Sequence, residues 1–397
     1  MGLFSSRRYG PHRSGRIVTI PASGTAFIAS DLHGHHGDFE ALLARSRIVE
    51  RLQKGEDAYL LITGDVPDLE RHRAIDRDVK ADGDVRILDR LIELEKELGP
   101  QAERIVYLEG NHDFHLIRIA REVEAFASRR GDRPPPRTGF HPIDPEVLAE
   151  YCKHYRQTFG DDVFENNITP YDMIHRVEPR HLEFLDKQPI LAVLEGAATL
   201  VTHAGPPKMG STSKRALRRE IEGSTREALA STTAEAYYAS PYHQLLNNRF
   251  RARDYDLRDV DEFLKVFSAQ LLVTGHTPHP YLVDFAKQGP LEGCDFRDGL
   301  GFVGKRQVVL CTSFGAFDNA RKRYIELDLS RAYTGVDDLR REKEIRPLYP
   351  DAVSPETGLD ETAQVIRALA RQHLAEEPRT SRFDPMALTE DAETRDD

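Results

Sequence analysis

The sequence predicts an α/β fold. Short apolar runs rich in β-branched residues alternate with segments of helical spacing, which is typical of strands interleaved with helices. Most of these runs end in Gly, Asp, Asn or His, as strands do where the following loops assemble a site. Gly and Asp also mark the turns that bound strands. The predicted strands are 26–30, 59–63, 105–109, 199–202 and 271–274.

Two helices are predicted between the first three strands, because apolar residues recur there every three or four positions. The second helix stops at Gly99-Pro100, a pair that ends helices. Two later apolar runs, 308–312 and 324–327, predict closing strands. The apolar positions of the two helices are Phe39, Leu42 and Leu43, then Val85, Leu88, Leu91, Ile92 and Leu98.

The chain is predicted to form one domain with two insertions, although its 397 residues would also allow two modest domains. An Arg-rich segment with three consecutive prolines and a polar, helix-prone segment interrupt the pattern. The chain from residue 335 is polar and acidic, which favours partial disorder with at most one helix near 362–374. The expected parts are a flexible N-terminus at 1–15, a domain at 16–334 with insertions at about 122–180 and 214–248, and a C-terminal extension at 335–397.

The composition is that of a soluble globular protein, with 39% hydrophobic and 30% charged residues and a net charge of −11. This acidic balance argues against broad attraction to nucleic acid or an anionic membrane. The three cysteines are widely spaced and odd in number, so they predict no disulfide framework and fit a reducing, cytoplasmic setting. No apolar stretch has the length of a membrane span. Gly2 with Ser6 fits an N-myristoylation pattern that is short enough to arise by chance.

Polar side chains suited to metal binding follow five of the predicted strands. Carboxylates, imidazoles and one amide oxygen make up the set, and such a mixture suits Mn, Fe or Zn. Turn-forming residues with incidental histidines would explain any single block, but five blocks in order, each after an apolar strand, indicate a site. The residues are Asp31 and His33, Asp65 and Asp68, Asn111 and His112, His203, and His276.

These blocks resemble the calcineurin-like metallophosphoesterase superfamily, with its Asp-x-His, Gly-Asp-x-x-Asp, Gly-Asn-His-Asp/Glu, strand-end His and Gly-His pattern. The resemblance spans roughly residues 16–329. The segments DLHGHHGDFEALL and LLVTGHTP most closely resemble the phosphoprotein phosphatase branch, which includes Ser/Thr phosphatases and diadenosine tetraphosphatase-like enzymes. It implies a four-layer α-β-β-α sandwich with two mixed sheets, plus the helical insertions.

The resemblance also implies two divalent metal ions, with Mn expected and Fe or Zn as alternatives. A bridging carboxylate holds such ions about 3.5–4 Å apart, where they clamp a phosphate and lower the pKa of bound water. His112 is then the general acid for the leaving group, and Asp68 orients its ring. Asp31 and His33 are expected to bind the first metal, Asp65 to bridge, and Asn111, His203 and His276 to bind the second.

Two departures from the family pattern bear on substrate binding. The Asp-Arg-Gly of protein phosphatases is replaced by Asp68-Leu69-Glu70, so that phosphate-binding arginine is missing. Arg249 resembles the arginine of a later family segment and is expected to contact phosphate, since a guanidinium matches phosphate oxygens. The out-of-register His279 is not expected to be a ligand. Weaker candidates for the phosphate contact are Arg71, Arg73 and Arg251.

The sequence therefore predicts a hydrolase in which metal-bound hydroxide attacks a phosphomonoester, with a protein Ser/Thr phosphatase-like activity. The alternatives are a dinucleoside polyphosphate hydrolase of the diadenosine tetraphosphate type and a non-catalytic phosphate-binding module. A nuclease is disfavoured by the acidic balance. The expected partner is a phosphoprotein or a nucleotide substrate, while the oligomeric state and the native metals stay open.

Overall fold

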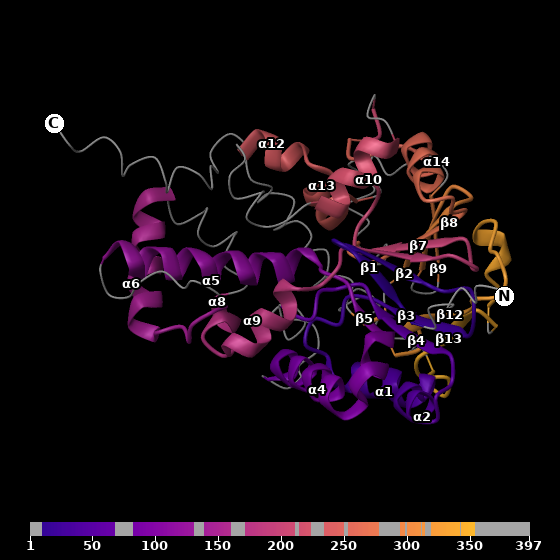
Figure 1. Cartoon of the computed structure of the whole chain (residues 1–397), viewed down its shortest axis with the longest axis horizontal. Coiled ribbons are helices and arrows are strands. Elements are labelled where there is room, and N and C mark those ends of the chain that lie inside the picture. The colour runs from indigo at the N-terminus through magenta and orange to yellow at the C-terminus, as the bar shows by residue number, and fades with distance from the viewer. Residues whose placement is uncertain are drawn as a thin grey trace, which may run out of the picture.

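The chain folds into four layers, with helices on the outer faces of two stacked β-sheets (Figure 1). This confirms the predicted α/β sandwich with two mixed sheets. Among the described residues, no helix combines the length and apolarity that crossing a membrane requires. A computed structural model describes residues 10–67, 82–130, 139–159, 171–210, 214–223, 234–249, 253–277, 294–297, 300–310, 312–313, 319–341 and 343–353.

The first sheet has five strands in the order β13-β12-β3-β4-β5. β3, β4 and β5 run parallel, so their carboxyl ends meet at one edge of the sheet. β12 pairs antiparallel with both β3 and β13. The strands are β3 (Thr25–Ala29), β4 (Ala58–Ile62), β5 (Ile105–Tyr107), β12 (Arg323–Asp328) and β13 (Ile345–Pro347).

The second sheet has eight strands in the order β1-β2-β6-β7-β8-β11-β10-β9. Within it, β7 and β8 lie side by side and parallel. The strands are β1 (His12–Ser14), β2 (Ile17–Ile20), β6 (Leu191–Leu194), β7 (Thr199–Thr202), β8 (Leu271–Thr274), β9 (Cys294–Arg297), β10 (Leu300–Val303) and β11 (Gln307–Leu310).

A dry core joins the two sheets. Ile28 and Leu61 from the five-stranded sheet pack in one cluster with Val201 and Val273 from the eight-stranded sheet. β4, β7 and β8 are buried along their whole length, as expected for strands covered on both faces. The apolar runs in the sequence therefore correspond to the middle of the sandwich.

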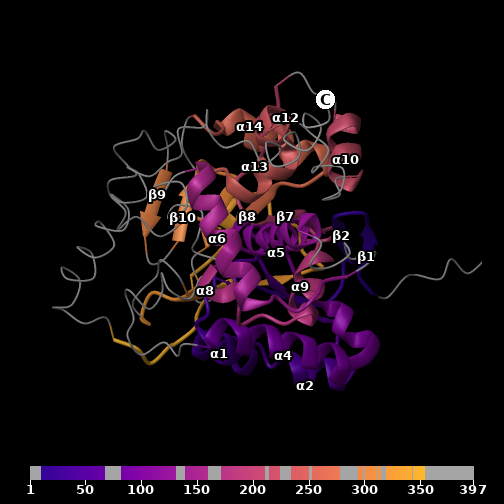
Figure 2. The ribbon, with the colours of Figure 1, turned by 90° about the vertical axis from the view of Figure 1, so that its left-hand side faces the viewer.

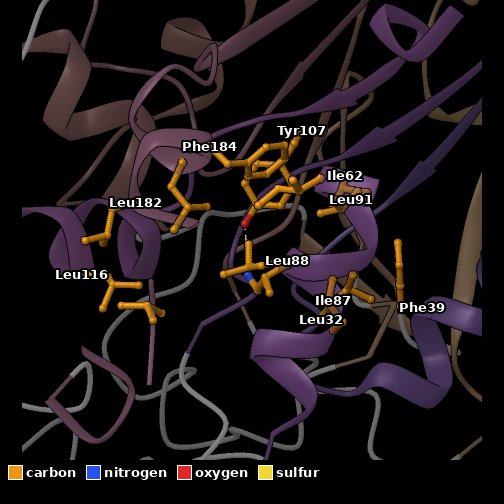
Figure 3. Packing of buried hydrophobic residues seen from close by; sticks show 14 of the residues in the cluster. Leu32, Phe39, Ile62, Ile87, Leu88, Leu91, Tyr107, Leu116, Leu182 and Phe184 are labelled. Carbon is orange, nitrogen blue, oxygen red and sulfur yellow. Dashed lines mark hydrogen bonds between the residues drawn. The ribbon is translucent and has the colours of Figure 1, made fainter. Parts of the chain in front are cut away.

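Helices close both outer faces, and the two views agree on their placement (Figures 1 and 2). Tyr107, Phe184 and Leu91 pack together under the five-stranded sheet (Figure 3). The helices on this side and beside it are α1 (His36–Ser46), α2 (Ile48–Gln53), α4 (Gly83–Leu98), α5 (Asn111–Arg129), α6 (Pro145–Phe159), α8 (Tyr171–Ile174) and α9 (Pro179–Asp186). Those on the opposite side are α10 (Lys214–Gly223), α12 (Ala234–Ala239), α13 (Pro241–Asn247) and α14 (Leu257–Val266).

The predicted strands agree with the structure to within one or two residues at each end. Two of them, Thr199–Thr202 and Leu271–Thr274, have the predicted bounds. The third strand ends at Tyr107 rather than at residue 109. It stops early because the amide of Glu109 donates to Pro189 outside the sheet and α5 begins at Asn111.

Short elements also lie in the two terminal stretches. His12–Ser14 form β1 by pairing with β2, within the stretch expected to be flexible. Beyond residue 334, the 3-10 helix η2 (Val336–Asp338) and β13 follow, and Leu348 is fully buried in the core below the five-stranded sheet. The helix predicted near 362–374 lies outside the described residues.

Leu348→Ala is expected to lower the free energy of unfolding by about 2–5 kcal/mol, because it deletes a fully buried side chain. Val353→Ala is the matched control, since this side chain is 88% exposed and its loss should cost less than about 0.5 kcal/mol. Urea unfolding followed by circular dichroism measures both. Equal midpoints for the two variants would show that the segment is not packed on the sheet.

Candidate metal centre

The loops that follow five strands bring the predicted ligands to one end of the sandwich. β3, β4 and β5 supply residues from one sheet, and β7 and β8 supply residues from the other. All six side chains are at least nine-tenths buried, and so is His112. The six are Asp31, His33, Asp65, Asn111, His203 and His276.

Four of these residues have a left-handed backbone. The φ angles are 47° at Asp31, 39° at His33, 57° at Asp65 and 63° at His276. They are four of the seven non-glycine residues with positive φ in the described part of the chain. Each such residue costs about 1–3 kcal/mol and persists only where its surroundings enforce it. This strain is concentrated where the strands turn their polar side chains inward.

Three potential ligand atoms surround Nε2 of His203. Its Nε2 lies 3.3 Å from Asp65 Oδ2, 3.0 Å from Asn111 Oδ1 and 3.1 Å from His276 Nδ1. Asp65, His203 and His276 form one group with ligand atoms within 4.8 Å of one another. A cluster of oxygen and nitrogen ligand atoms this close together suits a divalent transition metal.

The outer nitrogens of three histidines are fixed by backbone carbonyls. A carbonyl oxygen only accepts, so each outer nitrogen carries the proton and the inner nitrogen of the neutral ring keeps its lone pair. Metal-binding histidines are oriented in this way. The three bonds are His203 Nδ1 to Thr63 O at 2.6 Å, His33 Nδ1 to Pro67 O at 3.0 Å, and His276 Nε2 to Asn247 O at 3.1 Å.

A second group shares Asp65. His33 Nε2 lies 3.7 Å and His112 Nε2 lies 3.9 Å from Asp65 Oδ2, and the two rings meet edge to face at 5.0 Å. Asp31 belongs to neither group, but both of its carboxylate oxygens accept the amide of His276 at 3.0 Å. Asp65 therefore stands at the junction of two possible metal positions.

Burial and mutual charge determine the protonation of the metal-free centre. Burial opposes a charged imidazole, but the Asp65 carboxylate outweighs it and raises the pKa of His203 to about 9. Burial would likewise raise the pKa of Asp65, and the rings of His203 and His112 instead hold it well below its usual value. At Asp31, burial dominates and raises the pKa to about 7. Carboxylates in so dry a site are stabilised by a nearby cation.

The donor set therefore fits divalent metal ions. Asp65, Asn111 and the inner nitrogens of neutral His203 and His276 present lone pairs to one another. Acceptors that face one another are held together by a cation or a proton, which supplies the missing positive charge. Carboxylate, amide and imidazole ligands suit Mn, Fe and Zn without selecting among them.

Sequence reasoning gave no role to Asp113, which connects two of the loops. Its Oδ2 accepts the amides of Gly110 at 2.7 Å and Asp65 at 3.1 Å, and its Oδ1 accepts the hydroxyl of Tyr107 at 2.7 Å. Burial and the charge of Asp65 raise the pKa of Asp113 to about 8. Its place at the end of the Gly-Asn-His-Asp block was the only signal in the sequence.

The predicted substrate-binding residue Arg249 reaches the same end of the molecule. Its Nη1 donates to the carbonyl oxygen of His276 at 3.1 Å. Its backbone amide donates to Asp254 Oδ2 at 3.0 Å. The structure thus brings Arg249 together with the metal-binding candidates. The other residues considered from the sequence lie outside the described residues: Asp68, Arg71, Arg73, Arg251 and His279.

A four-layer sandwich with two buried His/Asp groups that share one carboxylate defines a metal-dependent phosphoesterase. A model of the calcineurin-like phosphoesterase family matches residues 25–280, more than half of the 397 residues, and the chain belongs to that family. The fold and the family together establish a metallophosphoesterase.

Several solved structures are similar to the chain. A protein serine/threonine phosphatase from Saccharomyces cerevisiae is 12% identical, with 87% of this chain and 86% of that chain covered and a TM-score of 0.44. A cold-active protein-tyrosine phosphatase of a psychrophilic Shewanella is 11% identical, covering 81% and 79%, with a TM-score of 0.39. A metallophosphoesterase from Sphaerobacter thermophilus is 14% identical, covering 89% and 99%, with a TM-score of 0.34. A search of curated proteins found no match.

Gly275→Ala is expected to reduce bound metal and activity, because a methyl group there would lie 2.2 Å from Asp31 Oδ2 and 2.8 Å from Thr63 Oγ1. Displacing a ligand should weaken metal affinity by roughly ten- to a hundredfold. Metal per chain after dialysis against Mn measures the loss. Gly223→Ala is the control, since no neighbouring atom lies within 4 Å of its added carbon. Equal metal content in both variants would contradict the assignment of Asp31.

Proposed function

We propose that this protein hydrolyses phosphomonoesters with two divalent cations that share Asp65. The observation that carries the proposal is the position of this carboxylate in both His/Asp groups. When bound, the two cations supply positive charge to the phosphate oxygens and acidify the attacking water. Manganese is the proposed metal, with iron and zinc as alternatives, since the donor set suits all three. Asp31 and His33 would hold the first cation, and Asn111, His203 and His276 the second.

The chain's own residues prepare the site for this reaction. The carbonyls of Thr63, Pro67 and Asn247 hold three imidazoles in the tautomer that presents a lone pair inward. The amide of His112 donates to Asp65 Oδ1 at 3.0 Å, which fixes the start of α5 against the bridging carboxylate. Because these contacts exist before substrate arrives, little reorganisation is needed during turnover.

His112 is proposed as the general acid. Its Nε2 faces the Asp65 side of the site, 3.9 Å from Oδ2, and its ring lies across that of His33. From there it would donate a proton to the oxygen of the departing alcohol, an effect worth about 10² to 10⁴ in rate. Asp68 would accept from its other ring nitrogen and keep the ring charged.

Arg249 is proposed to bind the substrate phosphate. Its bond to the His276 carbonyl places the guanidinium beside a proposed metal ligand, and the fork shape of a guanidinium matches phosphate oxygens. An arginine in this position can compensate for the Asp-Arg-Gly arginine that the sequence lacks.

The proposed substrate class is a phosphorylated serine or threonine side chain. The resemblance of the motif sequences to the phosphoprotein phosphatase branch supports this substrate class. A panel with Mn-loaded protein tests it by comparing phosphoserine peptides, an aryl phosphate, a cyclic nucleotide diester and diadenosine tetraphosphate. The highest kcat/KM is expected for the peptides, and a chelator should abolish every activity. Preference for diadenosine tetraphosphate would overturn the substrate class, and no metal-dependent turnover at all would overturn the proposal.

His112→Asn is expected to lower kcat by about 10² to 10⁴ for a phosphopeptide while two metals per chain remain bound. The loss should be much smaller for 4-nitrophenyl phosphate, whose acidic leaving group needs little protonation. Metal analysis and kcat for both substrates check this. Loss of one metal, with equal rate losses for the two substrates, would make His112 a ligand instead, as its proximity to His33 and Asp65 would allow.

A further inference from the structure

A buried lysine lies behind the loop that carries Asp31 and His33. Lys322 is only 2% exposed, and Asp38 is fully buried. The ammonium of Lys322 lies 3.0 Å from Asp38 Oδ1 and 2.8 Å from Oδ2. The hydroxyl of Tyr349 donates to the same Oδ1 at 2.7 Å. The buried Lys322 and Asp38 and the partly buried Tyr349 form a cluster, called here the Lys322 cluster.

The Lys322 cluster is joined to the metal-binding loop by short hydrogen bonds. Asp38 lies in the first turn of α1, and its amide donates to the His35 ring at 3.1 Å, which caps the helix. The amide of His35 donates to Leu32 at 2.8 Å, and that of His33 donates to Asp65 at 2.8 Å. The loop and the first turn of α1 therefore form one hydrogen-bonded unit.

The loop has a conformation that needs support from outside. Asp31, His33 and Gly34 all have positive φ, at 47°, 39° and 73°. For Asp31 and His33, which are not glycines, this backbone is strained and persists only where its surroundings enforce it. The backbone of Gly83 at the start of α4 packs against Gly34, since an added carbon at Gly83 would meet the Gly34 oxygen at 1.9 Å. The Lys322 cluster supports the other end of this hydrogen-bonded unit through its contacts with Asp38 in α1.

Stability alone does not account for the Lys322 cluster. Removing a lysine and an aspartate from water costs several kcal/mol per ion, and apolar side chains of similar volume often serve equally well. A charged cluster with directional bonds does fix geometry more narrowly than apolar packing. Lys322 and Tyr349 also lie outside residues 25–280, the part that matches the family model. The C-terminal segment thus braces a loop of the family core.

We propose that Lys322 and Tyr349 are positioning residues for the metal centre, acting through Asp38 to hold the loop that bears Asp31 and His33. This inference rests on the proposed metal-binding function. It assigns a task to the last strands of the sheet: β12 follows Lys322 directly, and Tyr349 comes two residues after β13. The effect of the cluster is on metal affinity rather than on the chemistry of hydrolysis.

The test variant replaces the charged and polar side chains of the cluster with apolar ones of similar volume, so that no cavity is created. The triple variant Asp38→Leu, Lys322→Met, Tyr349→Phe keeps an apolar, filled cluster, so its melting temperature is expected to stay near that of the wild type. Its affinity for Mn is expected to fall by about 10- to 100-fold, as for changes to residues behind metal ligands. Calorimetric titration with Mn, well below the melting temperature, measures affinity, and the visible spectrum of the Co-loaded protein reports on ligand geometry.

The control variant removes an ion pair between β12 and β13, the two strands next to Lys322 and Tyr349 in the chain. Arg346 and Glu326 lie 3.1 Å apart between β13 and β12, and both are partly exposed. The double variant Glu326→Gln, Arg346→Met is expected to leave Mn affinity unchanged. If the triple variant binds Mn as tightly as the wild type with an unchanged Co spectrum, the positioning role is wrong.

Two further outcomes keep the inference separate from the proposed function. Wild-type protein that binds no Mn would overturn the metal centre itself, before any variant is compared. If the triple variant does not fold, Tyr349→Phe carries the test, because it removes one hydroxyl and retains the ring. A several-fold loss of Mn affinity at an unchanged melting temperature is then expected, and unchanged affinity would overturn the positioning role.

Discussion

The carboxylate of Asp65 is the contact on which the arrangement of the site depends. It faces histidines from both sheets and accepts the backbone amide of His112 in the first turn of α5. It also lies where two possible metal positions meet. Burial alone would neutralise this group, and only the surrounding imidazoles or bound cations keep it charged. The strained loops, the carbonyl-fixed ring tautomers and the bond from the Asp65 amide to Asp113 all serve to place charges around the two carboxylate oxygens of Asp65.

The site is buried and yet contains charged groups, and this explains the polar contacts that surround it. His33, His203 and His276 are each held by a backbone carbonyl, and Asp31, Asp65 and Asp113 each accept backbone amides. Neutral backbone dipoles can be aligned in the interior without adding net charge, so the protein organises the centre with them. Arg249 lies at the border of the centre, where it donates to the His276 carbonyl.

The strands and loops that carry the proposed ligands could be predicted from the sequence because each signal is local: an apolar strand, a turn, then a polar side chain. β1 and β13 could not, since His12–Ser14 and Ile345–Pro347 are short and are not continuous apolar runs. The roles of Asp113 and Lys322 were also hidden. Lys322 meets Asp38 across 284 positions of the chain, and a lone lysine in a sequence carries no sign of its partner. Such pairings become visible only when the register of β12 against β3 is known.

The division of the ligands between two sheets has a consequence for assembly. Asp31, His33, Asp65 and Asn111 follow strands of one sheet, while His203 and His276 follow strands of the other. Neither sheet carries all six of these side chains, so the proposed set of donors is complete only when the two sheets pack together. If the proposed metal centre forms, metal binding is coupled to the packing of the two sheets, and a bound ion would add to the apolar core and the hydrogen bonds, such as His203 Nδ1 to Thr63 O, that already join them.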